Sequence, residues 1–171
     1  MELVDAMLQG RLDAAFVRTP VGPIDGLVVD HVLEEPMVAA LPAGHALVQS
    51  NTAPLPLAAL ATEPFILYRR PAGPGLYDAI VTACRGAGFS PVIEQEAPRL
   101  PSTLSLVAAG LGITIVPVSM EQASTPGVAF RALQECPGLS APINLALRRP
   151  PSTTAVRFRE TVRQLAIQRH A

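Results

Sequence analysis

The stretch PFILYRRPAGPGLYDAIVTACRGAG, residues 64–88, decides the fold. FILY at 65–68 is a short apolar run of the kind that forms a buried strand. RRPAGPG at 69–75 has the composition of a loop, and residues 76–86 carry apolar side chains at helical spacing, with Gly88 as the helix terminator. The helix positions expected to face inward are Ile80, Val81 and Cys84 or Ala83.

The same alternation continues downstream. The spacing predicts a strand over 92–95, a helix over 102–109, a tight turn at 110–112 and a strand over 113–118. Strand, helix, strand, helix and strand in succession indicate a lobe of α/β type with a parallel sheet.

On either side of this block lie shorter elements. A helix over 2–9 closed by Gly10 is followed by a strand over 12–17. Residues 27–32 and 36–41 form two strands or one long bent strand, and 46–63 is irregular with a short helix at 57–60. Two more strands are predicted over 128–133 and 143–148. A final helix over 153–167, capped by Ser152 or Thr153, is expected to turn inward Val156, Val162, Leu165 and Ala166.

Composition limits the function. Of the 171 residues 49% are hydrophobic and 16% are charged, which excludes a disordered chain. A net charge of -1 and the absence of Trp disfavour nucleic-acid binding by this chain itself. Cys84 and Cys136 are too few for a disulfide framework, so we expect reduced thiols. Without a long apolar run or a signal-peptide pattern, we expect a cytoplasmic protein and no membrane partner.

A ligand site is expected in a cleft. The chain enters the central block near residue 41 and leaves it near 120, and two such crossings between lobes make a hinge beside a cleft. Pro74, Gly75 and Leu76 open a helix after a buried strand, where main-chain N–H groups attract anions. The plain alternative is an ordinary strand-to-helix turn.

Other candidates flank this turn. Arg18 and Thr19 follow the strand over 12–17 and are expected at the carboxyl end of a parallel strand, or Arg18 is simply solvated there. Tyr68 and Arg69 end the strand over 65–68, with Tyr68 either a wall of the site or a core tyrosine. Ser102 is a ligand contact or only a helix N-cap.

No catalytic arrangement is visible in the sequence. His31, His45 and His170 lack the spacing of metal ligands, and the carboxylates form no acid–base pair. Neither a nucleophile turn nor a phosphate loop is present. The chain is therefore expected to be a binding module without cofactor or metal, and not an enzyme.

Four segments in order resemble the effector-binding part of LysR-type transcriptional regulators. They are LVDAMLQGRLDAAFVR at 3–18, LEEPMVAALPAGHAL at 33–47, PFILYRRPAGPGLYDAI at 64–80 and LVAAGLGITIVPVSM at 106–120. The resemblance covers nearly the whole chain, and the last segment is the most specific.

The resemblance implies a two-lobe fold of periplasmic-binding-protein type 2, with a small-molecule effector held between lobes. Lobe one would comprise 1–40 and 121–171 and be incomplete, because its first strand and helix are missing, and lobe two would comprise 41–120. The family's N-terminal helix-turn-helix is also missing, so DNA contact would need that absent domain. The loop at 74–77 resembles the place where an effector carboxylate meets main-chain N–H groups. Because the missing lobe-one elements normally supply ligand contacts, we expect weak effector binding or none.

Two alternatives remain beside the regulator. A solute-binding protein of a transporter shares this fold, and an enzyme relative would need a cleft Cys or Asp that the sequence does not offer. The resemblance also implies self-association. Family members pair through a helix matching 76–87 and a strand matching 92–95, whereas exposed apolar faces on 12–17 and 154–167 predict here a dimer that buries lobe-one surface.

Overall fold

The chain divides into two units. A computed structural model describes residues 2–18, 24–49, 54–70 and 74–169. Residues Met1–Glu34 and Pro142–Ala171 form unit 1, and Glu35–Ala141 form unit 2. The sequence placed the two crossings near residues 41 and 120, whereas the contacts place them at 34/35 and 141/142.

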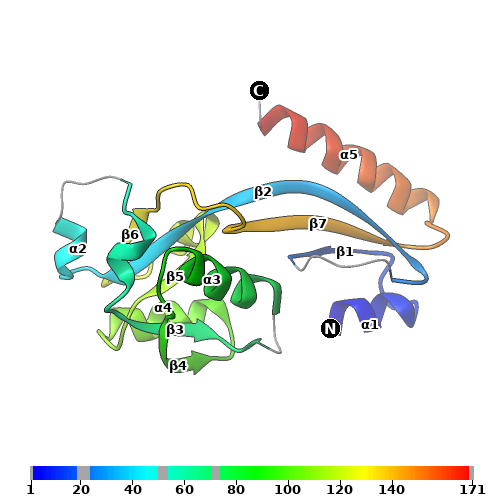
Figure 1. Cartoon of the computed structure of the whole chain (residues 1–171). Helices are drawn as coiled ribbons and strands as arrows, with labels where there is room; N and C mark the ends of the chain where they lie inside the picture. The colour runs from blue at the N-terminus through cyan, green and yellow to red at the C-terminus, as the bar shows by residue number, and fades with distance from the viewer. Residues whose placement is uncertain (1, 19–23, 50–53, 71–73, 170–171) are drawn as a thin grey trace. The chain divides into compact units, whose positions relative to one another are not determined.

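Unit 1 is a sheet with one helix on each face (Figure 1). Strand β1 (Ala14–Val17) pairs antiparallel with β7 (Ser140–Arg148), and β7 lies between β1 and β2 (Leu27–Pro42). Helix α1 (Glu2–Leu8) covers one face through Met7, which packs near Val17 and Ala146. Helix α5 (Thr153–Arg169) covers the other face through Ala155 and Val162, which pack against Leu145 and Leu147.

Unit 2 is built around the second half of β2. Strand β5 (Thr114–Pro117) pairs antiparallel with one side of β2, and β6 (Val128–Ala132) pairs antiparallel with the other side. Strands β3 (Pro64–Tyr68) and β4 (Val92–Ala97) pair in parallel, and a parallel bridge from Phe65 to Ile113 joins β3 to the start of β5. The purely parallel sheet expected for this block is therefore wrong: the pairs of β2 with β5 and β6 are antiparallel, and β3 and β4 form a separate parallel pair.

Helices α3 (Pro74–Gly86) and α4 (Leu100–Ala108) supply the crossovers of this unit. Ile80, Ala83 and Cys84 of α3 are buried in the main core with Phe65 and Leu67, as the spacing predicted. In the described residues, unit 2 also contains the short helices α2 (Ala46–Gln49), η1 (Leu57–Leu60) and η3 (Val118–Ala123). Within the described residues, no helix has the length and apolar character of a membrane span.

Of the two alternatives for residues 27–42, the single long strand is confirmed.

Other local expectations were wrong. Helix α2 lies in a segment predicted to be irregular; the Arg131 guanidinium of β6 donates to the Leu47 and Val48 carbonyls at its end, a support that no local pattern encodes. Val156 and Leu165 of α5 are exposed rather than buried, because the face of β1, β7 and β2 engages only Ala155 and Val162 fully.

Gly112 sits where the chain turns from α4 into β5. Its φ is +151°, and a Cβ at this position would lie 2.5 Å from the carbonyl oxygen of Pro64. That oxygen accepts the N–H of Ile113 at 2.8 Å, so it cannot move without breaking the link between β3 and β5. The close approach of two backbones here requires glycine.

We predict that Gly112→Ala lowers the free energy of unfolding by more than about 2 kcal/mol, since backbone must shift. Gly110→Ala is the matched control: its φ is +76°, but no atom lies within 4 Å of the added Cβ. The control is expected to cost about 1 kcal/mol from conformation alone. Urea unfolding measures both, and equal losses would contradict the steric argument.

Asp30 of β2 fixes α5 to the sheet of unit 1. Arg159 donates to both carboxylate oxygens, with Nη2 2.7 Å from Oδ1, and Arg163 Nη2 lies 3.3 Å from the same oxygen. The hydrogen bond from Arg159 is the main reason that the pKa of Asp30 lies below its usual value. The charged form of Asp30 therefore stabilises the folded state.

A folded-state pKa below the unfolded value gives stability that is present above pH about 4 and is lost as pH falls through the folded pKa. We predict that Asp30→Asn costs about 1–2 kcal/mol at pH 7 and loses less stability than the parent between pH 5 and 3. Asp13→Asn, which breaks an exposed pair with Arg148, should cost about 0.5 kcal/mol or less. Urea unfolding at pH 7, 5 and 3 measures the free energy of unfolding of each variant. If the stability of Asp30→Asn falls with pH as steeply as that of the parent, the role of the charged Asp30 is contradicted.

Candidate functional site

The start of α3 lies directly above the end of β3 in unit 2. Tyr68 is buried as the last residue of β3, and its hydroxyl oxygen accepts the main-chain N–H of Tyr77 at 3.1 Å. Its ring joins the core cluster that also holds Leu76. Tyr68 is thus a core tyrosine whose polar end supports the first turn of α3.

The first turn of α3 is an electropositive position. Pro74 opens the helix without a donor, and helix geometry gives the N–H groups of Gly75 and Leu76 no acceptor within the helix. This turn contains no acidic residue. The helix dipole and these N–H groups favour an anion at this end.

The carboxylate of Asp78, just after the first turn of α3, is paired with Arg70. Arg70 donates to Asp78 through Nε at 2.7 Å and Nη2 at 3.0 Å, a bidentate pair between two exposed side chains. The hydrogen bond from Arg70 is the main cause of the lowered pKa of Asp78. The sequence reasoning missed this pair, because its eight-residue separation spans a loop and carries no helical spacing.

Arg69 is the other cation at the end of β3. Its main-chain N–H extends the pairing with β4 by donating to the Ala97 carbonyl at 2.8 Å, and its side chain is exposed. Among the described residues its guanidinium makes no hydrogen bond or ion pair. Arg69 can therefore meet an anion approaching the surface near α3.

Ser102 does not cap α4. The helix begins at Leu100, its N-cap is Arg99 without a side-chain cap, and Ser102 lies inside the first turn, where its N–H donates to the Arg99 carbonyl at 3.0 Å. The cap expectation is wrong because Pro101 starts the helix earlier than the serine pattern indicated. Ser102 is half-buried.

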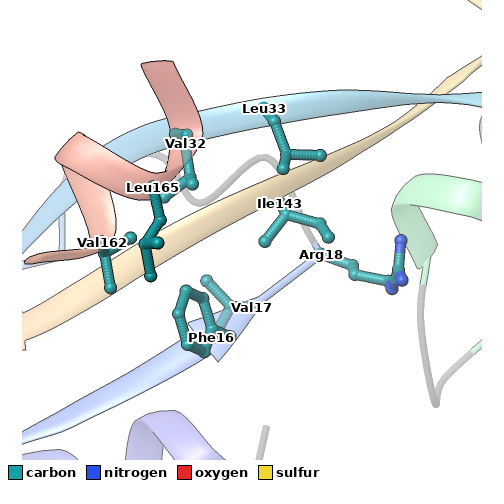
Figure 2. A pocket seen from close by; sticks show the side chains of 9 residues that line it. Phe16, Val17, Arg18, Val32, Leu33, Ile143, Val162 and Leu165 are labelled. Carbon is teal, nitrogen blue, oxygen red and sulfur yellow. The ribbon is translucent and has the colours of Figure 1, made fainter. Parts of the chain in front are cut away.

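Arg18 follows β1 in unit 1. The expected parallel strand is wrong: β1 is antiparallel to β7. Arg18 is half-buried and borders a cavity of about 390 Å³, whose other walls are apolar (Figure 2). Thr19 lies outside the described residues. The residues that line the cavity with Arg18 are Phe16, Val17, Val32, Leu33, Ile143, Val162, Leu165 and Ala166.

The remaining reactive groups have structural surroundings. Burial raises the pKa of the Cys84 thiol to about 11, so this thiol is protonated and a poor nucleophile at neutral pH. His45 accepts the Leu47 N–H at Nδ1 and lies 3.1 Å from Glu63 through Nε2. In the described part of the chain, no group of three His, Cys, Asp or Glu residues is placed to hold a metal ion.

Comparison with known proteins agrees with this architecture. The family described as the LysR substrate binding domain matches residues 1–166. The chain is 35% identical over 159 residues to the HTH-type transcriptional regulator BudR of Raoultella terrigena, covering 92% of this chain and 54% of BudR. It is 36% identical over 150 residues to the regulator CatR of Pseudomonas putida, covering 87% of this chain and 50% of CatR. The chain thus spans about half the length of these relatives.

Solved structures show the same fold. The effector-binding domain of BenM with its effector benzoate matches 99% of this chain and 76% of its own, with a TM-score of 0.84 at 26% identity. CbnR, a LysR family transcriptional regulator, matches 96% of this chain and 56% of its own, with a TM-score of 0.84 at 25% identity. These relatives are regulators and not enzymes. The chain therefore belongs to the LysR substrate-binding domain family and has its α/β fold of periplasmic-binding-protein type 2.

Proposed function

We propose that this chain is the ligand-sensing part of a cytoplasmic LysR-type regulator and that it binds a small anionic metabolite. The proposal of an anionic ligand rests on the first turn of α3. This turn has N–H groups without acceptors in the helix, contains no acidic residue, and is bonded to Tyr68 at the end of β3. BenM, a relative in fold, has been solved with its effector benzoate, which is a carboxylate.

Each site residue has a role in this proposal. Pro74 sets the helix start, and the N–H groups of Gly75 and Leu76 hold the anionic group. The Tyr68 hydroxyl stabilises the first turn of α3 by accepting the Tyr77 N–H, and the exposed guanidinium of Arg69 attracts the anion. Ligand contacts by Ser102, and separately by Arg18 and Thr19, are proposed from the sequence pattern alone.

DNA contact is assigned to another segment of the regulator rather than to these residues. The chain has 13 basic and 14 acidic residues, so it lacks the positive surface that neutralises phosphates. The full-length relatives are about twice as long as the part that matches, which leaves room for a separate DNA-reading part in those proteins. The chain's contribution to regulation is the binding of the metabolite.

The first test is a thermal shift assay of the chain with benzoate, succinate and a panel of other small carboxylates at about 10 mM, a concentration that registers weak ligands. At least one carboxylate should raise the melting temperature by a few degrees, since binding to the folded state stabilises it. Benzamide is the neutral control for benzoate. A panel without any shift, or equal shifts from acids and their amides, would contradict an anion site.

The second test concerns Gly75. Replacing it with Val puts a branched side chain over the first-turn N–H groups, so Gly75→Val should weaken carboxylate binding about tenfold or more while the melting temperature stays within a few degrees. Gly86→Val is the matched control at the other end of α3, where no atom lies within 4 Å of the added Cβ. Unchanged affinity in Gly75→Val would remove this residue from the site.

A third test separates support from contact. Tyr68→Phe keeps the buried ring but removes the acceptor for the Tyr77 N–H, so unfolding should become easier by about 1 kcal/mol. Urea unfolding measures the loss. A neutral effect on stability would show that water replaces the hydroxyl and that Tyr68 does not hold the turn.

A further inference from the structure

His45 stands directly before α2, the short helix that follows β2 in unit 2 (Figure 1). Its Nδ1 atom accepts the Leu47 N–H at 3.2 Å, and its main-chain carbonyl accepts the Val48 N–H at 2.9 Å. A side chain that accepts a donor of the first turn from this position is an N-cap. His45 therefore caps α2 through one ring nitrogen.

The other ring nitrogen of His45 has a carboxylate partner. Nε2 lies 3.1 Å from Oε2 of Glu63, which follows η1, and both side chains are half-buried. An ionised carboxylate only accepts hydrogen bonds, so Nε2 carries a proton in this pair. A neutral imidazole has one protonated nitrogen, which leaves Nδ1 as the acceptor that the Leu47 N–H requires. The two hydrogen bonds together select the neutral tautomer protonated at Nε2.

Protonation of the ring removes one of these hydrogen bonds and keeps the other. An imidazolium carries a proton on both nitrogens, so Nδ1 no longer accepts the Leu47 N–H. The Nε2 proton still faces Glu63, and the pair now has opposite charges. The ring of His45 therefore stays held to Glu63 while α2 loses its cap. Histidine is the side chain that makes this change between about pH 5 and 8.

The charged groups around α2 do not replace the lost acceptor. Arg131 of β6 donates to the Leu47 and Val48 carbonyls, and a guanidinium has no acceptor to offer the Leu47 N–H. Apart from Arg131, the neighbouring elements β6, η1 and the end of β2 at 38–42 contain no titratable side chain, and neither does α2. On these elements, the charges that face α2 and its cap are Glu63 and Arg131.

We propose that His45 is a proton-operated cap: the neutral ring holds the first turn of α2, and the protonated ring releases it. The responding element has four residues, too few to persist without its cap and its tertiary contacts. Leu47 and Val48 pack, partly buried, against the main core of unit 2, so the release uncovers apolar surface beside that core. Unit 2 thus carries an acid-sensitive segment that uses none of the residues of the anion site proposed at α3.

The tautomer of His45 is tested first, by ¹⁵N NMR of the parent chain at about pH 8, where histidine is neutral. The ring-nitrogen shifts should identify Nε2 as the protonated nitrogen and Nδ1 as the unprotonated one. A ring protonated at Nδ1 would overturn the proposal, because it could not accept the Leu47 N–H.

Amide hydrogen exchange between about pH 8 and 5 then measures the release of α2. The protection factor of Leu47, its exchange rate relative to an unstructured peptide at the same pH, should fall about fivefold or more as the cap is lost. Ala59 is the matched amide, since it donates to the Pro56 carbonyl at the start of η1 and has no histidine cap. Constant protection of Leu47, or an equal fall at Ala59, would contradict the cap.

His45→Asn separates the cap from other effects of pH. Asparagine is a good N-cap whose side-chain oxygen accepts at every pH, so the protection of Leu47 should stay constant across the range. His31→Asn is the matched control: His31 lies on β2 in unit 1, with Nδ1 3.3 Å from Asn144 Oδ1, and its loss should leave the response of Leu47 unchanged. A response that survives in His45→Asn or disappears in His31→Asn would overturn the proposal.

Glu63→Gln keeps the test informative if His45→Asn does not fold. Glutamine still offers an oxygen to the Nε2 proton, and His45 remains able to gain a second proton, so Leu47 should still lose protection as pH falls. If the response is absent in Glu63→Gln, the titrating group is the carboxylate rather than the ring, and the proposal is wrong.

Discussion

The second half of β2 is the constraint on which unit 2 depends. Ala39, Ala40 and Leu41 are fully buried, and their main-chain groups pair with β5 on one side and β6 on the other. Buried backbone must be hydrogen-bonded, so both neighbours have to be in register before this strand is stable. Because the side chain of Ala40 is small, α4 can approach β2 closely, and Leu104 of α4 packs in the same cluster as Ala40. The same strand begins in unit 1, where Asp30 holds α5.

Most elements of the fold could be predicted from local pattern. The apolar runs of β3 and β5 and the spacing of Ile80, Ala83 and Cys84 encode their own burial. The errors have nonlocal causes. The direction of β1 is set by β7, more than a hundred residues away, and α2 depends on Arg131 of a distant strand. Val156 and Leu165 have the apolar character of core residues, but a helix residue is buried only where side chains of the sheet pack against it. In α5 those positions are Ala155 and Val162.

The candidate site was predictable to a similar degree and for a similar reason. A strand, a loop and a helix in succession predict a helix start near Pro74–Leu76, and α3 does begin at Pro74. Whether Tyr68 touches ligand or supports the turn depends on the direction of one hydroxyl, which the fold aims at the Tyr77 N–H. Ser102 shows the opposite case: a serine near a helix start favours a cap, but Pro101 moved the start two residues earlier.

The bond from the Tyr77 N–H to the Tyr68 hydroxyl has a consequence for ligand chemistry. It commits one first-turn donor to the protein itself, so the site proposed above has the N–H groups of Gly75 and Leu76 left for an anion. Two adjacent donors match the two oxygens of a single carboxylate. In the proposed site, the Tyr68 hydroxyl therefore sets how many first-turn donors are left for a ligand, and the two that remain fit one carboxylate group.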